Sequence, residues 1–357
     1  MNGLNLLQQY IKEQELTGAI LLSPINLHYF AGFTGTTGFA IITEDKAFMI
    51  TDFRYTEQAT KQCEGYTVIQ YETTVMDILV DIFNEHHIHE GLFAIEGKQM
   101  PVDTYESLCD TLDENFDFTS VNFAKLRAVK REDEIELLRI AANIGDEAFA
   151  ALLPQLKVGM TENEVRIILE TEMLKRGSEE PSFATIIASG SRSSMPHGVA
   201  SDKVIEAGDF VTIDFGSVYK GYHSDMTRTI VMGPASDLQK KLYSIVLEAQ
   251  KRGVAAVRAG ITGKELDAIC RDYIKEHGYT KEFNHGTGHG LGLEIHEEPV
   301  ANTKSDTVFT ENMIITVEPG IYITGTIGLR IEDSVIVKSD GYEVLTHSPK
   351  ELIEIGI

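Results

Sequence analysis

The chain has 357 residues, 43% of them hydrophobic and 24% charged, which is the balance of an ordinary soluble globular protein, and its length favours two domains. The formal net charge of −24 argues against a nucleic acid or an anionic membrane as a partner, because phosphate-bearing surfaces would repel it.

Three widely spaced cysteines form neither a CxxC pair nor a disulfide framework, which fits a reducing cytosol. The first ten residues have no cationic start and no long apolar run, so we expect neither a signal peptide nor a membrane anchor. We therefore expect a cytoplasmic protein.

The first 125 residues alternate helix-like and strand-like patterns. Helices are predicted over residues 4–14, 74–84 and 102–112, and strands over residues 18–22, 38–43, 46–50, 66–71, 92–95 and 116–121. Together they predict a small α/β domain with a mixed sheet. The glycine-rich segment Gly32–Gly38 lacks the lysine of a phosphate-binding loop, so we expect it to be a plain loop.

A charged segment, Lys130–Glu134, leads into a helix whose apolar residues recur at helical spacing. The predicted apolar face comprises Ile135, Leu138, Ala142, Phe149 and Leu152. We place the domain boundary just before this helix, which gives domains of residues 1–125 and 126–357.

The second domain contains an internal repeat. Residues 159–164 (Gly-Met-Thr-Glu-Asn-Glu) recur as residues 260–265 (Gly-Ile-Thr-Gly-Lys-Glu), an offset of 260 − 159 = 101. Each copy has the Thr-x-x-Glu capping box that begins a helix, and each helix is expected to end at a glycine, Gly177 or Gly278. His197 and His296 also occupy similar places, 99 residues apart.

Acidic residues follow the same duplication. Asp214 follows an apolar, β-branched run and precedes Phe215-Gly216, and Glu318 stands in the same context 104 residues later. Each run continues through a glycine-bearing turn to a second acidic strand, around Asp225 and around Glu332. We therefore predict two copies of helix, helix and β-hairpin that bring four carboxylates to one central site, because core packing alone gives buried strands no need for acids.

With His289 in a glycine-rich turn, these four carboxylates make a ligand set suited to two divalent cations. One imidazole among the ligands favours Mn²⁺, Co²⁺, Zn²⁺ or Fe²⁺ over Ca²⁺. Without the ions the acids would repel one another, so we expect raised carboxylate pKa values in the metal-free protein.

Several alternatives accompany this set. Strand alternation puts only one of Glu332 and Asp333 on the metal face, and we choose Glu332. His223 shares a face with Asp225 and could be a sixth ligand, although a supporting or ordinary strand role is favoured. No HExxH motif is present, and Gly286–Gly292 spaces its glycines as GxGxGxG, so neither a single-zinc helical site nor a dinucleotide site is supported.

These segments together closely resemble the pita-bread metallopeptidases, the family of methionine aminopeptidase, aminopeptidase P and prolidase. The matching segments are Pro196–Gly198, Ile213–Gly216, Ser224–Arg228, His285–Gly292, His296, Glu318–Gly320 and Arg330–Asp333. The domain in front resembles the creatinase-type N-terminal domain of the proline-specific members. The resemblance implies an α+β protein, with a duplicated pita-bread domain behind an α/β creatinase-like domain.

The resemblance also implies how the metals would be held. Asp214 would chelate one ion, Asp225 and Glu332 would bridge both ions, and His289 and Glu318 would complete the shell of the second. A hydroxide that bridges the two metals, which the resemblance implies are manganese, would be the nucleophile.

Other residues receive roles from the same resemblance. Glu318 would act as general base and then protonate the leaving proline nitrogen. His197 and His296 would contact the substrate and stabilise the tetrahedral intermediate, His285 would line the pocket near proline, and Arg330 would brace the site.

The hypothesis is therefore a two-metal exopeptidase that cleaves between an N-terminal residue and proline in peptides or dipeptides, as an Xaa-Pro dipeptidase or aminopeptidase, and the resemblance favours a homodimer. The alternatives are a metal-free amidinohydrolase of the creatinase type and a non-catalytic pita-bread binding module. Because all five ligands are present, both alternatives are disfavoured.

Overall fold

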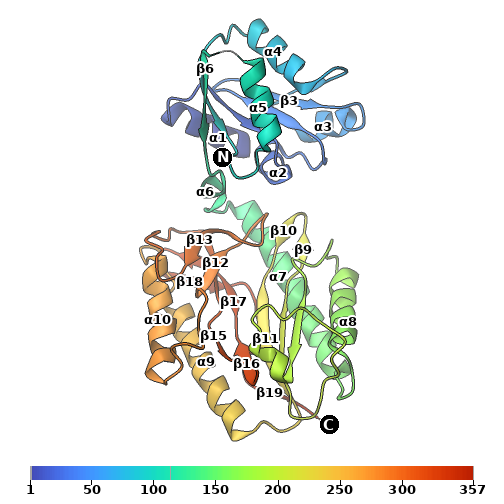
Figure 1. Cartoon of the computed structure of the whole chain (residues 1–357), viewed down its shortest axis with the longest axis vertical. Coiled ribbons are helices and arrows are strands. Elements are labelled where there is room, and N and C mark those ends of the chain that lie inside the picture. The colour runs from blue at the N-terminus through green and yellow to red at the C-terminus, as the bar shows by residue number, and fades with distance from the viewer. Residues whose placement is uncertain (1, 113, 357) are drawn as a thin grey trace. The chain divides into compact units, whose positions relative to one another are not determined.

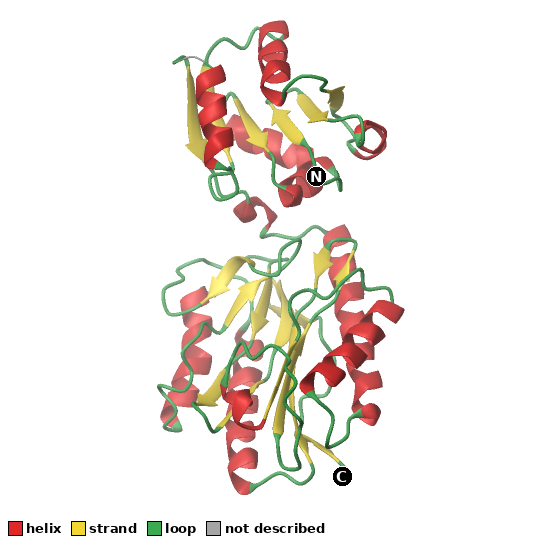
Figure 2. Cartoon of the chain, turned by 45° about the vertical axis from the view of Figure 1, so that its right-hand side comes forward, coloured by secondary structure: helices red, strands yellow, loops and turns green. Residues whose placement is uncertain are grey.

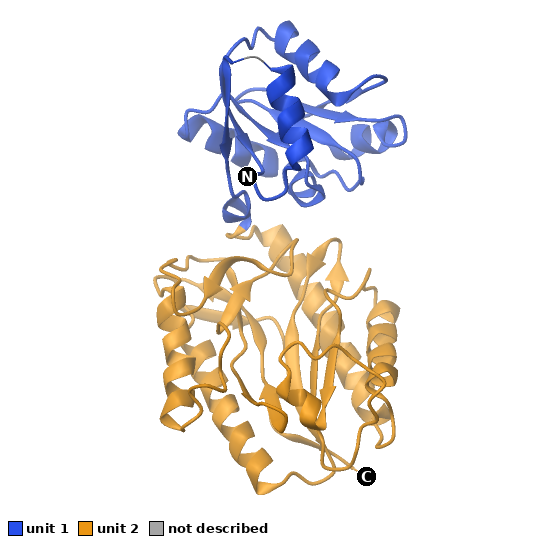
Figure 3. Ribbon diagram, viewed as in Figure 1, with its two compact units in different colours: residues 1–127 blue, residues 128–357 orange. Residues whose placement is uncertain are grey.

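The structure is a computed structural model that describes residues 2–112 and 114–356 (Figure 1). Helices and strands are interspersed throughout the chain (Figure 2). The chain divides into two compact units, residues 1–127 and 128–357 (Figure 3). Among the described residues, none of the helices combines the length and apolar character needed to cross a membrane.

The first unit is built on a six-stranded mixed sheet with the strand order β4-β3-β2-β1-β5-β6. Its strands are β1 (Gly18–Leu21), β2 (Phe39–Ile42), β3 (Ala47–Thr51), β4 (Thr67–Gln70), β5 (Gly91–Ile95) and β6 (Phe116–Ser120). Its helices are α1 (Gly3–Glu13), α2 (Pro24–Ala31), α3 (Thr56–Gln62), α4 (Val75–Glu85), α5 (Val102–Thr111) and α6 (Ala124–Arg127). The strands and three longer helices predicted for this part are confirmed, and so is the mixed character of the sheet.

Three helices of the first unit lack a sequence prediction, α2, α3 and the four-residue α6. Helix α2 buries five of its eight residues on several sides, so its apolar residues do not recur at the spacing that marks an amphipathic helix. Its ends are nonetheless well defined, because the Ser23 side chain caps the first turn and Gly32 adopts the left-handed conformation after the last.

The second unit begins with one copy of the predicted repeat. The elements of this first half are α7 (Glu132–Leu152), the 3₁₀ turn η1 (Leu153–Gln155), α8 (Glu162–Lys175), β7 (Ile186–Ser189), the 3₁₀ turn η2 (Gly190–Ser194), β8 (Phe210–Phe215), β9 (Val218–Tyr219), β10 (Tyr222–His223) and β11 (Met226–Met232). The apolar face predicted for α7 is buried at all five positions.

The second half repeats this order. Its elements are α9 (Asp237–Ala256), α10 (Gly263–Glu276), β12 (Gly288–Gly290), β13 (Glu297–Ala301), β14 (Ile314–Val317), β15 (Gly320–Ile323), β16 (Ile327–Arg330), β17 (Asp333–Lys338), β18 (Gly341–Val344) and β19 (Ile353–Ile355). Helices α9 and α10 flank the strands on one side of this unit and α8 flanks them on the other (Figure 1).

The predicted capping boxes are present at the start of α8 and α10. Thr161 and Thr262 each accept a hydrogen bond from the backbone three residues on, and the glutamate at that position bonds back to the cap. Gly177 and Gly278 follow the two helices with φ values of 100° and 90°, a conformation that glycine adopts without strain. The predicted duplication of these helices is therefore confirmed.

The two long hairpins are also duplicated. Strand β8 pairs antiparallel with β11, and β14 pairs antiparallel with β17. A short two-stranded ribbon lies between the arms of each hairpin, β9–β10 in the first half and β15–β16 in the second.

Hydrogen bonds join the halves where the hairpins meet. The Glu332 backbone N–H donates to the Thr227 carbonyl at 3.1 Å, and the Thr229 hydroxyl donates to the Arg330 carbonyl at 2.9 Å. These bonds fix the register between the two acidic strands.

Candidate metal centre and active-site cavity

A cavity of about 400 Å³ in the second unit is lined by side chains of both halves. Its lining includes every predicted site residue: His197, Asp214, Asp225, His285, His289, His296, Glu318, Arg330 and Glu332. The remaining wall is largely apolar and includes Phe183, Ala184, Ile186, Val199 and Ile295. Polar groups therefore converge at one part of a mostly apolar hollow, as is typical of small-ligand sites.

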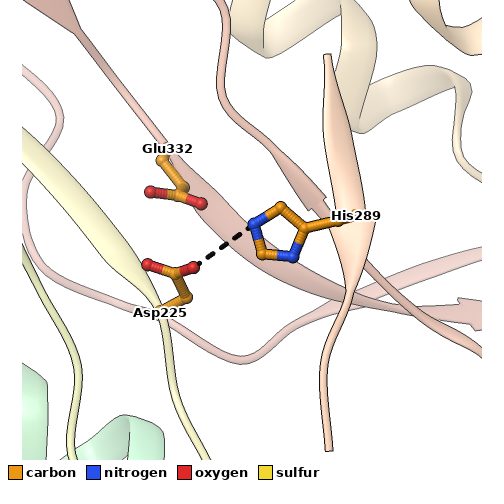
Figure 4. A group of neighbouring side chains, drawn as sticks. All are labelled: Asp225, His289 and Glu332. Carbon is orange, nitrogen blue, oxygen red and sulfur yellow. Dashed lines mark ion pairs between the residues drawn. The ribbon is translucent and has the colours of Figure 1, made fainter. Parts of the chain in front are cut away.

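Three of these side chains form the tightest group. One ligand atom each from Asp225, His289 and Glu332 lies within 4.8 Å of the other two (Figure 4). The Nε2 atom of His289 is 3.5 Å from an oxygen of Asp225 and 3.5 Å from an oxygen of Glu318. Donor atoms from both halves therefore gather around one small volume.

The hairpin geometry explains this convergence. Asp225 immediately precedes β11, and Glu332 immediately precedes β17. Asp214 lies on β8 directly opposite Thr227 of β11. Glu318 directly follows β14, and its backbone N–H donates to the Thr287 carbonyl at 2.8 Å. Each acid thus stands at a strand end or in a strand whose partner fixes its direction.

His289 reaches the acids because its strand lies very close to β14. Its backbone N–H donates to the Thr316 hydroxyl at 3.1 Å. A Cβ atom at the preceding Gly288 would lie 1.8 Å from the Thr316 carbonyl oxygen, far inside van der Waals contact. Glycine at position 288 is therefore required for this approach.

Burial and mutual repulsion perturb the acids. Burial, followed by the charges of Glu332, Asp214 and Glu318, raises the pKa of Asp225 well above its ordinary value. Burial raises the pKa of Glu318 to about 8, against the opposing effect of Arg330. Burial, then Glu318 and Asp214, likewise raises the pKa of Glu332. Raised pKa values were expected from the sequence, and they are found for these three carboxyl groups.

The imidazole of His289 is oriented as a ligand. Burial lowers its pKa to about 4, so the ring is neutral near pH 7. Its Nδ1 atom lies 3.1 Å from the Gly290 carbonyl oxygen, which can only accept, so Nδ1 carries the hydrogen. The unprotonated Nε2 consequently faces the oxygens of Asp225 and Glu318, and its lone pair points toward the space where a cation would lie.

The donor set fits divalent cations for a further reason. Oxygen Oδ1 of Asp214 and oxygen Oε1 of Glu332 are buried, and neither hydrogen-bonds within the part of the chain that the structure describes. Buried oxygens normally have partners, and a bound cation would supply one to each. The chemistry is that of hard oxygen donors with one nitrogen, which suits a first-row divalent metal.

Arg330 connects several of these groups. It donates to Asp214 Oδ2 at 2.5 Å, to the Thr227 hydroxyl at 3.0 Å and to the Tyr322 hydroxyl at 2.6 Å. The Thr227 hydroxyl in turn donates to Glu332 Oε2 at 2.7 Å. One buried guanidinium therefore orients two of the acids.

The same chain reaches His285. Because Tyr322 accepts from Arg330, its own proton is directed to Nε2 of His285, at 3.2 Å. The other ring nitrogen, Nδ1, lies 2.8 Å from the Gly286 carbonyl oxygen and donates to it. Both nitrogens of His285 are thus engaged inside the protein, and the ring presents carbon atoms to the cavity.

The other two histidines are less constrained. The His296 ring packs edge-on against His289, with 4.3 Å between centroids. Burial, then the neighbouring His197, lowers the pKa of His296. His197 itself is exposed at the cavity wall.

The structure also places the residues on which the sequence left a choice. Glu332 faces the cavity, whereas Asp333 points away and pairs with Arg228 at 2.8 Å. His223 is not among the residues that line the cavity.

Two residues that organise the site, Thr227 and Tyr322, were missed as site residues. Thr227 lies two positions after Asp225, so the strand period places both on one face and could have revealed it. Tyr322 gives no comparable signal, because its role depends on Arg330 eight residues later in the chain, across the β15–β16 ribbon.

Comparison with known proteins identifies the family. Residues 136–339 match the family described as metallopeptidase family M24. The chain belongs to family M24. Residues 4–129 of this M24 metallopeptidase also match the creatinase/prolidase N-terminal domain. The resemblance and the fold class predicted from the sequence are confirmed.

Individual relatives of this M24 metallopeptidase extend over nearly its whole length. A solved Xaa-Pro dipeptidase from Bacillus anthracis is 47% identical, with a TM-score of 0.95 and 99% of both chains covered. A solved X-Pro aminopeptidase from Thermotoga maritima is 38% identical, with a TM-score of 0.90, covering 96% of this chain and 98% of that one. An Xaa-Pro dipeptidase of Pyrococcus furiosus is 39% identical over 97% of this chain and 98% of its own.

Proposed function

We propose that the protein is a two-metal exopeptidase that hydrolyses the peptide bond between an N-terminal residue and proline. The observation that carries this proposal is the cavity in which buried carboxylates with unpartnered oxygens and one unprotonated imidazole nitrogen converge beside an apolar wall. The names of the relatives, Xaa-Pro dipeptidase and X-Pro aminopeptidase, support the substrate class.

The proposed metal ligands are the five that the sequence predicts. Asp214, Asp225, His289, Glu318 and Glu332 would together hold two divalent ions. Two divalent ions held there would supply a hydroxide nucleophile near neutral pH, by lowering the pKa of water. Manganese is the proposed ion, and cobalt, zinc or iron would also suit these donors.

The remaining steps belong to the chain's own residues. Glu318 would accept a proton from the attacking water and deliver it to the proline nitrogen as the bond breaks. His197 and His296 would donate hydrogen bonds to the oxygen of the tetrahedral intermediate.

Substrate recognition would use the engaged ring of His285. Because both of its nitrogens are occupied, its carbon face offers an apolar surface against which a proline ring can pack. Arg330 would hold Asp214 in place throughout.

Further parts of the proposal concern the whole protein. We assign residues 1–125 to a creatinase-like domain and residues 126–357 to the catalytic domain. A homodimer and a cytoplasmic location are also proposed, and the free thiols of Cys63, Cys109 and Cys270 support a reducing compartment. Light scattering on the purified protein tests the dimer.

Metal dependence and substrate preference test the central proposal together. The protein is stripped with a chelator, reloaded with Mn²⁺, Co²⁺, Zn²⁺ or Fe²⁺, and assayed on Xaa-Pro dipeptides, on Xaa-Pro-Xaa tripeptides and on Ala-Ala as a control. We expect activity only on the proline peptides, and only after reloading with about two ions per chain, counted by elemental analysis. The ratio of dipeptide to tripeptide rates distinguishes a dipeptidase from an aminopeptidase.

Two variants test the ligand assignment. Asp214→Ala and Glu318→Ala should abolish hydrolysis, because each removes a proposed ligand and Glu318 is also the proposed base. Near-normal turnover in either variant would refute the assignment. Hydrolysis of creatine by metal-free protein would instead support an amidinohydrolase, and metal binding without any turnover would support a binding module.

A further inference from the structure

His197 depends on its backbone for its position over the cavity. The residue is exposed, and neither ring nitrogen hydrogen-bonds to another residue within the described ranges 2–112 and 114–356. It lies in the segment that joins β7 to β8, and we call residues 190–200 of this segment the His197 loop. Whatever fixes the two ends of this loop therefore fixes the imidazole.

One carboxylate bonds to both ends of the His197 loop. Glu162 is the first residue of α8 and is fully buried. Its Oε1 accepts from the backbone N–H and the hydroxyl of Ser189, each at 2.8 Å. Its Oε2 accepts from the backbone N–H of Ser201 at 3.1 Å and from the Ser201 hydroxyl at 2.6 Å. A single side chain thus closes the loop at its base.

An arginine extends the same contact into the loop. Arg192 forms an ion pair with Glu162 through Nη1. Its Nη2 donates to the Val199 carbonyl at 2.9 Å, two residues from His197. On the opposite side, Arg330 donates to the Pro196 carbonyl at 3.3 Å. The backbone on either side of His197 is therefore held from two directions.

Helix capping does not account for this carboxylate. The capping box of α8 is formed by Thr161 and Glu164, and Glu162 takes no part in it. A buried carboxylate is costly unless its oxygens are fully bonded, so its presence needs another explanation.

The second half of the repeat shows that the fold does not require a carboxylate at this position. Position 263 corresponds to 162 at the repeat offset of 101, and it is glycine. A Cβ atom at Gly263 would lie 2.1 Å from the Val300 carbonyl oxygen. In the second half, backbone atoms therefore pack directly against the start of the helix, whereas in the first half the Glu162 side chain bonds to a loop from the same position. The carboxylate is a feature of the half that carries His197.

We propose that Glu162 is a positioning residue that holds His197 over the reacting bond by tying both ends of the His197 loop to α8. This inference rests on the proposed function, in which His197 contacts the tetrahedral intermediate. Glu162 itself touches no substrate.

The variant Glu162→Gln tests it. Each oxygen of this carboxylate accepts from a backbone N–H, that of Ser189 or that of Ser201, so the amide nitrogen of the variant would face one of these N–H groups without accepting from it. We expect kcat on an Ala-Pro dipeptide to fall about tenfold to a hundredfold, with a small change in KM, because the reacting groups are misplaced.

A matched control comes from the first unit. Glu96 is also fully buried and also accepts from two backbone N–H groups and a serine hydroxyl, those of Leu22 and Ser23. Glu96→Gln should lower thermal stability as Glu162→Gln does, but leave kcat unchanged.

A double-mutant cycle separates positioning from general damage. If Glu162 acts through His197, then Glu162→Gln should cause no further loss of kcat in a His197→Ala background. Multiplicative losses in the double variant would overturn the proposal.

Hydrogen–deuterium exchange gives a readout that needs no activity. Amides of residues 190–201 should exchange faster in Glu162→Gln than in the wild type or in Glu96→Gln. Unchanged exchange there would overturn the proposal. If the wild type failed to hydrolyse Xaa-Pro peptides, the proposed function would fall, and the exchange result alone would decide whether Glu162 anchors the loop.

Discussion

The ion pair between Lys130 and Glu297 offers the sharpest test of how the cavity is supported. Both side chains are 1% exposed, and their charged atoms lie 2.8 Å apart. Glu297 directly follows His296, and a Cβ atom at Gly292 would lie 2.7 Å from its Oε2. The pair therefore underlies the β12–β13 hairpin that carries His289 and His296.

Lys130→Met should destabilise the second unit strongly, because it removes the cation that lies 2.8 Å from a buried carboxylate. Removing one partner of a buried pair costs about 3–5 kcal/mol. The unit has 357 − 127 = 230 residues. At ~2.1 cal/mol/K per residue its unfolding entropy is about 480 cal/mol/K, so the melting temperature should fall by about 6–10 °C.

The assay is thermal unfolding followed by circular dichroism, with two further variants. Lys61→Met removes an ion pair to Glu57 whose partners are 70% and 84% exposed, and it should shift the melting temperature by no more than about 2 °C. Adding Glu297→Gln to Lys130→Met should recover much of the loss, because the buried negative charge that faced Lys130 is then removed as well. A shift for Lys130→Met as small as that for Lys61→Met would refute the reasoning.

Three further predictions concern the metal centre. Gly288→Ala should lower turnover at least a hundredfold by displacing His289, whereas Gly341→Ala, where a Cβ meets nothing within 4 Å, should change turnover less than twofold on peptide assay. Asp225→Asn should weaken metal binding at least tenfold in calorimetry, since it removes a charged donor. Metal-free protein should lose stability as pH rises from about 6.5 to 8: above the ordinary histidine pKa of 6.5 the lowered pKa of His289 no longer opposes the effect, and the raised pKa of Glu318 makes the folded state bind more protons than the unfolded state, so the melting temperature should be lower at pH 8 than at pH 6.5, and metal should remove most of the difference. An equal melting temperature at both pH values would contradict this.

The features of the fold and the site that could be predicted from the sequence are those that depend on residues close together in the chain. The Thr-x-x-Glu boxes at Thr161 and Thr262 predict helix starts because the cap and its partner are three residues apart. The duplication made the acidic site predictable as well, because Asp214 and Glu318 in matching sequence contexts indicate a shared site more strongly than either residue alone. All the predicted site residues consequently line one cavity.

The parts that could not be predicted depend on partners far apart in the chain. Lys130 and Glu297 are 167 residues apart, and no local pattern marks either as one half of a buried pair. Glu162 reads as an ordinary first-turn acid of a helix, and only the folded chain brings Ser189 and Ser201 to it. Helix α2 was missed because burial on several sides erases the amphipathic pattern.

The bonds that join the two hairpins have a consequence for how the enzyme can fail. Thr227 and Glu332 are hydrogen-bonded to each other across the boundary between the repeats. Glu332 is a proposed metal ligand, and Thr227 lies two residues after another, Asp225. Any slippage of one repeat against the other therefore dismantles the reaction centre in the same movement. Loss of turnover becomes the earliest sign of a loosened scaffold, well before the helices melt.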